Sequence, residues 1–169
     1  MKLHSNYNFY NRMTVKSFIT TLYKKDYYLW IQTTIKQLKD KNLDVVDWEN
    51  LIEELDSLGK QQQQELENRL IILLEHLLKL AYWEMEREYN ERGWKGTIIE
   101  QRKQILRILK KNPSLKPYLA EIFAECYADA RDIVSVKTGL NLEIFPALPP
   151  LNIEQTLDEK WFLDELLQN

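Results

Sequence analysis

Apolar residues recur every three or four positions along most of the chain, which is the spacing of one face of an α-helix. A first helix is predicted to begin after Asp26 and a second after Asp47, since aspartate is a favourable N-cap residue. The apolar stripe of the first helix contains Tyr27, Trp30, Ile31, Ile35 and Leu38. That of the second contains Trp48, Leu51, Ile52, Leu55 and Leu58. We expect this second stripe to be buried, and Gly59 to end or bend its helix.

The third predicted helix is the longest and covers about residues 60–87. Its main apolar face contains Leu66, Leu70, Leu73, Leu74, Leu77, Leu80 and Ala81. Ile71 and Leu78 widen that face to about half the circumference, a feature typical of a helix at the centre of its domain. After Trp83, in EMEREYNERG, charges occupy every side, so we expect this end to project into solvent.

Two more long helices and short C-terminal helices complete the prediction. Thr97 and Glu100 form a T-x-x-E capping pattern that opens a fourth helix. Ser114 is placed to cap a fifth helix and Gly139 to end it. No segment alternates convincingly at the two-residue period of a strand. The fold class is therefore all-α, a bundle of about five main helices around the helix at 60–87, with residues 22–169 as one domain and residues 1–21 as a partly flexible extension.

Composition narrows the function classes. The chain has 169 residues, of which 44% are hydrophobic and 29% charged, which is ordinary for a globular protein. Its net charge of −3 gives no overall attraction to nucleic acid or to an anionic membrane. No apolar run has the length of a membrane span. The single cysteine, Cys126, cannot form an intramolecular disulfide, so a cytoplasmic location is expected, with no membrane or nucleic-acid partner.

Several blocks of sequence are familiar in their order. The stretch from LYKKDYYLW to LLKLAYW, then WKGTIIEQRKQILRILKK with the helix that follows it, and finally FP and TLDEKWF occur in that order between residues 22 and 162. Together they resemble a largely cyanobacterial family, the domain-of-unknown-function family number 29. In many relatives a YQPE-like segment follows the leucine run, where this chain has YWEMEREYNERGW. The resemblance implies a small helical cytoplasmic protein and no particular activity.

Arg102 is the most unusual residue by position. It lies at the centre of the apolar stripe of the fourth predicted helix, between Ile98 and Ile105. A guanidinium at such a place needs a carboxylate, because an isolated buried charge is very costly. Glu54 or Glu53 of the acidic second helix is the expected partner, in a salt bridge that fixes helix register. An anion-binding arginine in a cleft and an arginine that extends to solvent are the alternatives.

His76 has three interpretations. It is a half-buried histidine that bonds a carboxylate or a main-chain carbonyl, a metal ligand together with Glu53 or Glu54, or the general base of a ribonuclease. In the last case Arg69 would stabilise the phosphorane, and the spacing of Arg69 and His76 is similar to the R-x4-6-H motif of HEPN nucleases. No E-x-x-H pair of the di-iron type is present, and no cofactor is expected.

No nucleotide-binding glycine motif and no nucleophile motif stands in the sequence. The leading functional prediction is therefore a small non-enzymatic binding or regulatory module that acts through a protein partner. Its contact surfaces would be the segment EMEREYNERGW and the N-terminal part, which is rich in tryptophan and tyrosine. The alternative is a metal- or base-dependent hydrolase or ribonuclease centred on His76, Glu54 and Arg102, with Arg69 as a further candidate. A homo-oligomer is left open.

Overall fold

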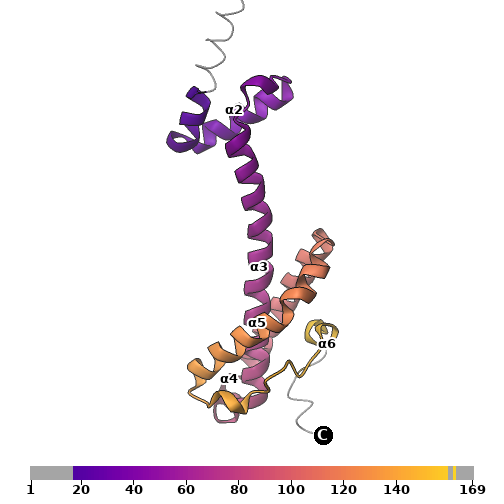
Figure 1. Cartoon of the computed structure of the whole chain (residues 1–169). Helices are drawn as coiled ribbons and strands as arrows, with labels where there is room; N and C mark the ends of the chain where they lie inside the picture. The colour runs from indigo at the N-terminus through magenta and orange to yellow at the C-terminus, as the bar shows by residue number, and fades with distance from the viewer. Residues whose placement is uncertain (1–16, 160–161, 163–169) are drawn as a thin grey trace, which may run out of the picture. The chain divides into compact units, whose positions relative to one another are not determined.

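The computed structural model describes residues 17–159 and residue 162. Every regular element among these residues is helical, so the chain is an all-α protein, as its sequence predicts (Figure 1). The chain divides into two compact units, with the boundary after Gly59. The expected flexible extension up to residue 16 and most of the expected C-terminal helix, at 160–161 and 163–169, lie outside the described residues.

The N-terminal unit is a small group of helices. Its elements are a helical segment at 17–25, α2 (Tyr27–Lys39), the 3-10 turn η1 (Leu43–Val45) and the first turns of α3, which begins at Trp48. Ile19, Leu22 and Trp30 form its buried core, so the expected domain boundary at residue 22 falls inside a packed helix. Asp26 caps α2 as predicted, because its carboxylate accepts a hydrogen bond from the Leu29 N–H at 3.0 Å.

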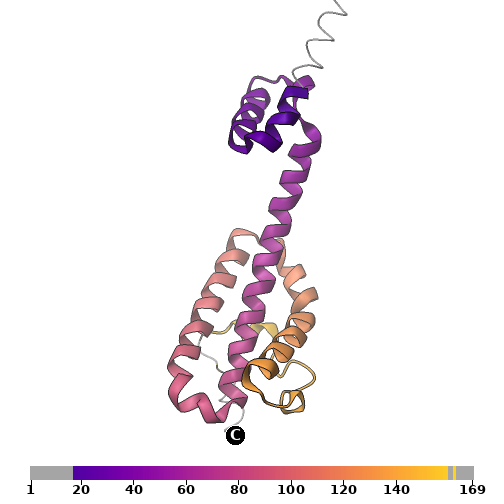
Figure 2. The same cartoon turned by 90° about the vertical axis from the view of Figure 1, so that its left-hand side faces the viewer.

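The C-terminal unit is a helical bundle around the leucine-rich part of α3. Its elements are α3 from Lys60 to Tyr82, α4 (Glu84–Lys111), α5 (Leu115–Thr138), η2 (Leu142–Ile144) and α6 (Ile153–Leu157). This part of α3 lies between α4 and α5 (Figure 2). Its seven buried leucines, at positions 66, 70, 73, 74, 77, 78 and 80, are each at most 3% exposed. The predicted central position of this helix is therefore confirmed.

The predicted helix boundaries are wrong on both sides of this region. The second and third predicted helices are one helix, α3, which runs from Trp48 through Gly59 to Tyr82. The chain then turns back at the non-helical residue Trp83, and α4 begins at Glu84 (Figure 2). A single glycine in a helix costs only about 1 kcal/mol, so good helix-forming neighbours override it.

The segment EMEREYNERGW forms the first turns of α4 and is not a projection of α3. Its last residue, Trp94, is buried and stacks on Trp83 with ring centroids 5.5 Å apart. Thr97 therefore lies inside α4, where its hydroxyl donates to the Gly93 carbonyl oxygen at 3.2 Å. A capping pattern is only four residues long, and a threonine inside a helix satisfies its hydroxyl one turn back instead of capping a new helix.

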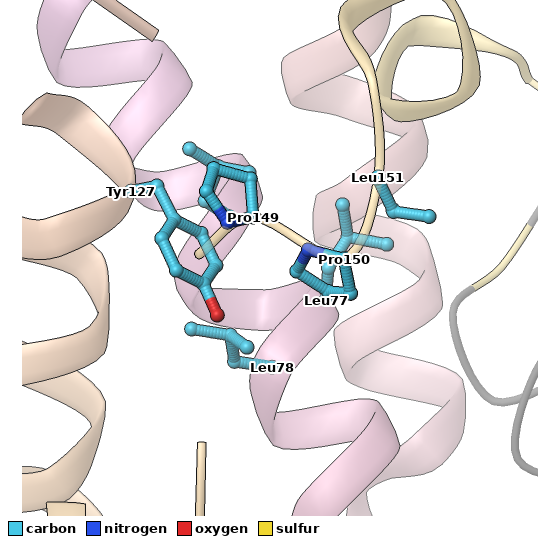
Figure 3. Close-up of a pocket in the computed structure, with 7 residues that line it drawn as sticks. Leu77, Leu78, Tyr127, Pro149, Pro150 and Leu151 are labelled. Carbon is cyan, nitrogen blue, oxygen red and sulfur yellow. The ribbon is translucent and has the colours of Figure 1, made fainter. Parts of the chain in front are cut away.

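The chain after α5 is fastened to the bundle by hydrogen bonds to main-chain carbonyls. Gly139 ends α5 as predicted, with a φ of 71°. The Tyr127 hydroxyl donates to the Pro146 carbonyl oxygen at 2.7 Å. In Figure 3, Pro149 and Pro150 lie among Tyr127 of α5 and Leu77 and Leu78 of α3. The free volume there is only about 10 Å³, at the lower limit for one water molecule, so this is a packed contact with no room for a substrate.

Candidate protein-binding groove

His76 lies on α3 in the C-terminal unit and is half-buried. Its Nδ1 lies 2.8 Å from the Ile72 carbonyl oxygen, which only accepts, so Nδ1 carries the proton. Burial lowers the pKa of His76, and the hydrogen bond to Ile72 only partly opposes this. The ring is therefore neutral at pH 7. This geometry matches the first of the three interpretations, a histidine bonded to a main-chain carbonyl.

Arg69 is occupied by neighbouring side chains. Its Nε and Nη2 bind the Glu65 carboxylate at 3.0 and 2.8 Å, and its Nη1 donates to Gln101 Oε1 at 3.3 Å. His76 follows seven residues later on the same helix, about 10 Å further along its axis. The structure therefore does not bring Arg69 and His76 together.

Arg102 is fully buried, as predicted, but the predicted partner is wrong. Its Nε donates to the Thr156 carbonyl oxygen at 2.8 Å, and its guanidinium lies over the Phe162 ring, 5.3 Å from the centroid. Burial lowers its pKa to about 10, and the charges of Asp158 and Glu159 oppose this. The carboxylates whose charges act on Arg102 are thus those of Asp158 and Glu159, which follow α6, and not Glu53 or Glu54. Nη1 and Nη2 have no hydrogen-bond partner among the described residues.

Glu75, which helical periodicity does not single out, is a buried carboxylate of the C-terminal unit. It is 3% exposed and binds Lys79 at 2.5 Å and Lys137 of α5 at 2.9 Å. Burial alone would raise its pKa, but the two lysines lower it below its ordinary value. The Glu75 carboxylate links α3 to α5, and its single negative charge is compensated by the two lysines.

Glu54 belongs to the N-terminal unit and is bound by two tyrosines. The Tyr23 and Tyr27 hydroxyls donate to its two oxygens at 2.7 and 2.6 Å. These bonds lower the pKa of Glu54, and the same carboxylate raises the pKa of Tyr23 to about 12. Glu53 is exposed. Within residues 17–159 and at 162, no three side chains of histidine, cysteine, aspartate or glutamate gather as a metal site would require.

Beside Glu54, α2 and the first turns of α3 enclose an apolar groove of about 410 Å³. Tyr27 and Trp30 stack at its end, with centroids 5.8 Å apart. The residues that line it are Tyr27, Trp30, Ile31, Thr34, Ile35 and Leu38 of α2, and Leu51, Glu54, Leu55 and Leu58 of α3. Almost every side chain in this lining is apolar, and the groove belongs entirely to the N-terminal unit.

The apolar surface continues past the groove onto the outer side of α3. Leu55 is 60% exposed and Ile52 is 62% exposed, and Trp48 continues the same stripe one turn earlier. We refer to Trp48, Ile52 and Leu55 as the ridge. The expectation that this stripe is buried is therefore wrong, since among residues 17–59 only Leu51 of the stripe packs on the core of the unit. Such a contiguous exposed apolar surface is typical of interaction sites.

A family model described as a domain of unknown function, DUF29, matches residues 22–162. The chain belongs to this family. The DUF29 match begins within the helical segment at 17–25 and includes the groove, the ridge and the bundle around α3. No curated protein and no solved structure matches the chain significantly. No helix among the described residues of this DUF29 protein is long and apolar enough to cross a membrane.

Sequence periodicity could not have found the groove. Ile35, Leu38, Leu55 and Leu58 repeat at helical spacing just as core residues do, because periodicity identifies an apolar face and not what covers it. The number of large apolar side chains is the signal in the sequence that points to an exposed apolar surface. The N-terminal unit has 59 residues, and its stripes contain more large apolar side chains than so small a unit can bury.

Proposed function

We propose that this DUF29 protein is a non-enzymatic helical binding module that acts through a protein partner, and that the groove and the ridge are its contact surface. The observation that carries the proposal is the exposure of aliphatic residues from two helices around one hollow. Burying such a surface stabilises a complex by roughly 25 cal/mol per Å² of apolar area removed from water. Grooves between two helices receive amphipathic helices through aliphatic side chains at i, i+3, i+4 and i+7.

The rival proposal, a hydrolase or ribonuclease centred on His76, Glu54 and Arg102, receives no support from the contacts of these residues. Glu54 is bound to tyrosine hydroxyls of the N-terminal unit. In the C-terminal unit, His76 is bonded to a main-chain carbonyl and Arg102 is fully buried.

A cytoplasmic location fits the lone thiol of Cys126, since burial raises its pKa to about 11 and keeps it protonated.

Site-specific photocrosslinking in the native host tests the proposal. A benzophenone amino acid replaces Leu55 in the groove or, as the matched control, Leu148, which is 78% exposed on a loop of the C-terminal unit. We expect light to produce a discrete covalent adduct with a polypeptide from position 55 and none from position 148. Equal and featureless labelling at both positions would overturn the proposed function.

A further inference from the structure

The groove has a charged rim on each side. Lys36 and Lys39 of α2 follow groove residues by one position each, so they lie about 100° further around that helix. Glu49 and Glu53 of α3 follow ridge residues in the same way. All four side chains are exposed. The basic rim therefore borders the groove on α2, and the acidic rim borders the ridge on α3.

The groove and the ridge are both apolar and lie on one face. Two copies of that face can therefore fit together, with the ridge of one copy against the groove of the other. A two-fold axis that runs parallel to the groove, between the groove and the ridge, places the ridge of each copy in the groove of the other. The same operation brings the basic rim of each copy to the side of the contact that carries the acidic rim of the other copy. A two-fold axis across the groove would instead bring like charges together, which is destabilising.

We propose that the occupant of the groove is the ridge of a second copy of this chain, in a symmetric dimer held by the N-terminal units. The inference rests on the proposed function and names the partner of that surface. A single foreign helix in the groove would cover the lining but leave Ile52 and Trp48 exposed beside it. The second copy covers the groove and the ridge together and provides opposite charges for both the basic and the acidic rim.

Sedimentation velocity of the purified full chain over a wide concentration range tests the dimer. The parent is expected to shift from monomer to dimer with rising concentration. Leu55→Asp places a charge at the centre of the contact and should raise the dissociation constant at least about 30-fold. Leu148→Asp makes the same chemical change on an exposed loop and should leave it within about twofold. Circular dichroism checks that both variants remain helical.

Charge reversal tests the arrangement of the two copies. Lys36→Glu with Lys39→Glu gives a face with two acidic rims, and Glu49→Lys with Glu53→Lys gives a face with two basic rims. Each double variant alone should dimerise more weakly than the parent, and an equimolar mixture should form a heterodimer. A dimer whose dissociation constant is unchanged by Leu55→Asp and by both charge reversals would overturn the inference.

The failure of the inference is distinguishable from the failure of the proposed function. A parent that stays monomeric at every concentration, while position 55 crosslinks to a different polypeptide, overturns the dimer and keeps the binding surface. A monomeric parent without a specific crosslink overturns both.

Discussion

The Arg102 guanidinium donates from Nε to the Thr156 carbonyl oxygen at 2.8 Å, and both residues are fully buried. The bond joins α4 to α6, two elements separated by 54 positions in the sequence. Thr156 also donates its hydroxyl to the carbonyl oxygen of Asn152, the N-cap residue of α6, at 2.8 Å, which is a bond within that helix. The buried arginine therefore fastens the chain after the bundle to the bundle itself.

Arg102→Ala is expected to lower the free energy of unfolding by about 2–4 kcal/mol. The change removes a charged hydrogen bond, leaves the Thr156 carbonyl oxygen unpaired and opens a cavity. Arg102→Met should cost less, because it fills most of the space and removes the desolvated Nη groups. Urea denaturation at pH 7 measures both. Lys103→Ala, at the exposed neighbouring position, is the control, and a loss at Arg102 within roughly 0.5 kcal/mol would show that the bond contributes little.

Glu75→Gln is expected to destabilise the C-terminal unit by about 1–3 kcal/mol at pH 7. The amide cannot compensate Lys79 and Lys137, and Lys79 would keep a charge that is only 11% exposed. Glu121→Gln, on the exposed side of α5, should change stability by no more than about 0.5 kcal/mol. Thermal or urea unfolding of the two variants beside the parent gives the comparison.

The Glu75 contribution should also depend on pH in a definite direction. The folded pKa of Glu75 lies below its ordinary value of 4.5, so the unfolded chain binds the proton more readily. This stability is fully present above the ordinary pKa and is lost as the pH falls through the folded pKa. The difference in unfolding free energy between parent and Glu75→Gln should therefore shrink below about pH 4.5. A difference that stays constant on acidification would contradict the ion-pair assignment.

The sequence predicted the burial of Arg102 and could not predict its partner. Ile98, Arg102 and Ile105 share one face of α4, and a residue between two core positions is buried whatever covers it. The partner depends on where a distant segment packs, and the Thr156 carbonyl is a main-chain group that no side-chain pattern reveals. The carboxylates of Glu53 and Glu54 have suitable chemistry, but they belong to the N-terminal unit.

Glu54→Gln is expected to return the pKa of Tyr23 from about 12 towards its ordinary value of 10.0. The Tyr23 hydroxyl donates to a carboxylate, and the negative charge opposes formation of the phenolate. Glu53→Gln is the matched control and should have a smaller effect, because Glu53 acts on Tyr23 only through its charge. The pH dependence of the Tyr23 ring carbon shift, assigned with Tyr23→Phe, reports the pKa. An unchanged titration in Glu54→Gln would show that this hydrogen bond is absent in solution.

The core of the C-terminal unit was predictable because its signal is local and long. Leu66 to Leu80 keep their spacing over several turns, and so wide an apolar face has no stable place except a domain centre. The turn at Trp83 was not predictable, since a break of one residue leaves no run of glycine, proline or polar residues to mark it in the sequence. The same limit applies at Gly59, where a helix-breaking residue stands inside a helix.

Gly59→Ala is expected to raise the free energy of unfolding by about 0.5–1 kcal/mol, because alanine loses less conformational entropy than glycine in a helix interior. Apart from its own turns of helix, a Cβ atom at Gly59 would meet no atom of the described chain within 4 Å, so the gain is not offset by crowding. Gly139→Ala serves as the opposite case. Its φ of 71° is strained for alanine although the space is open, so this change should destabilise by about 1 kcal/mol. Equilibrium unfolding of both variants checks the signs, and destabilisation by Gly59→Ala would mean that α3 is interrupted at Gly59.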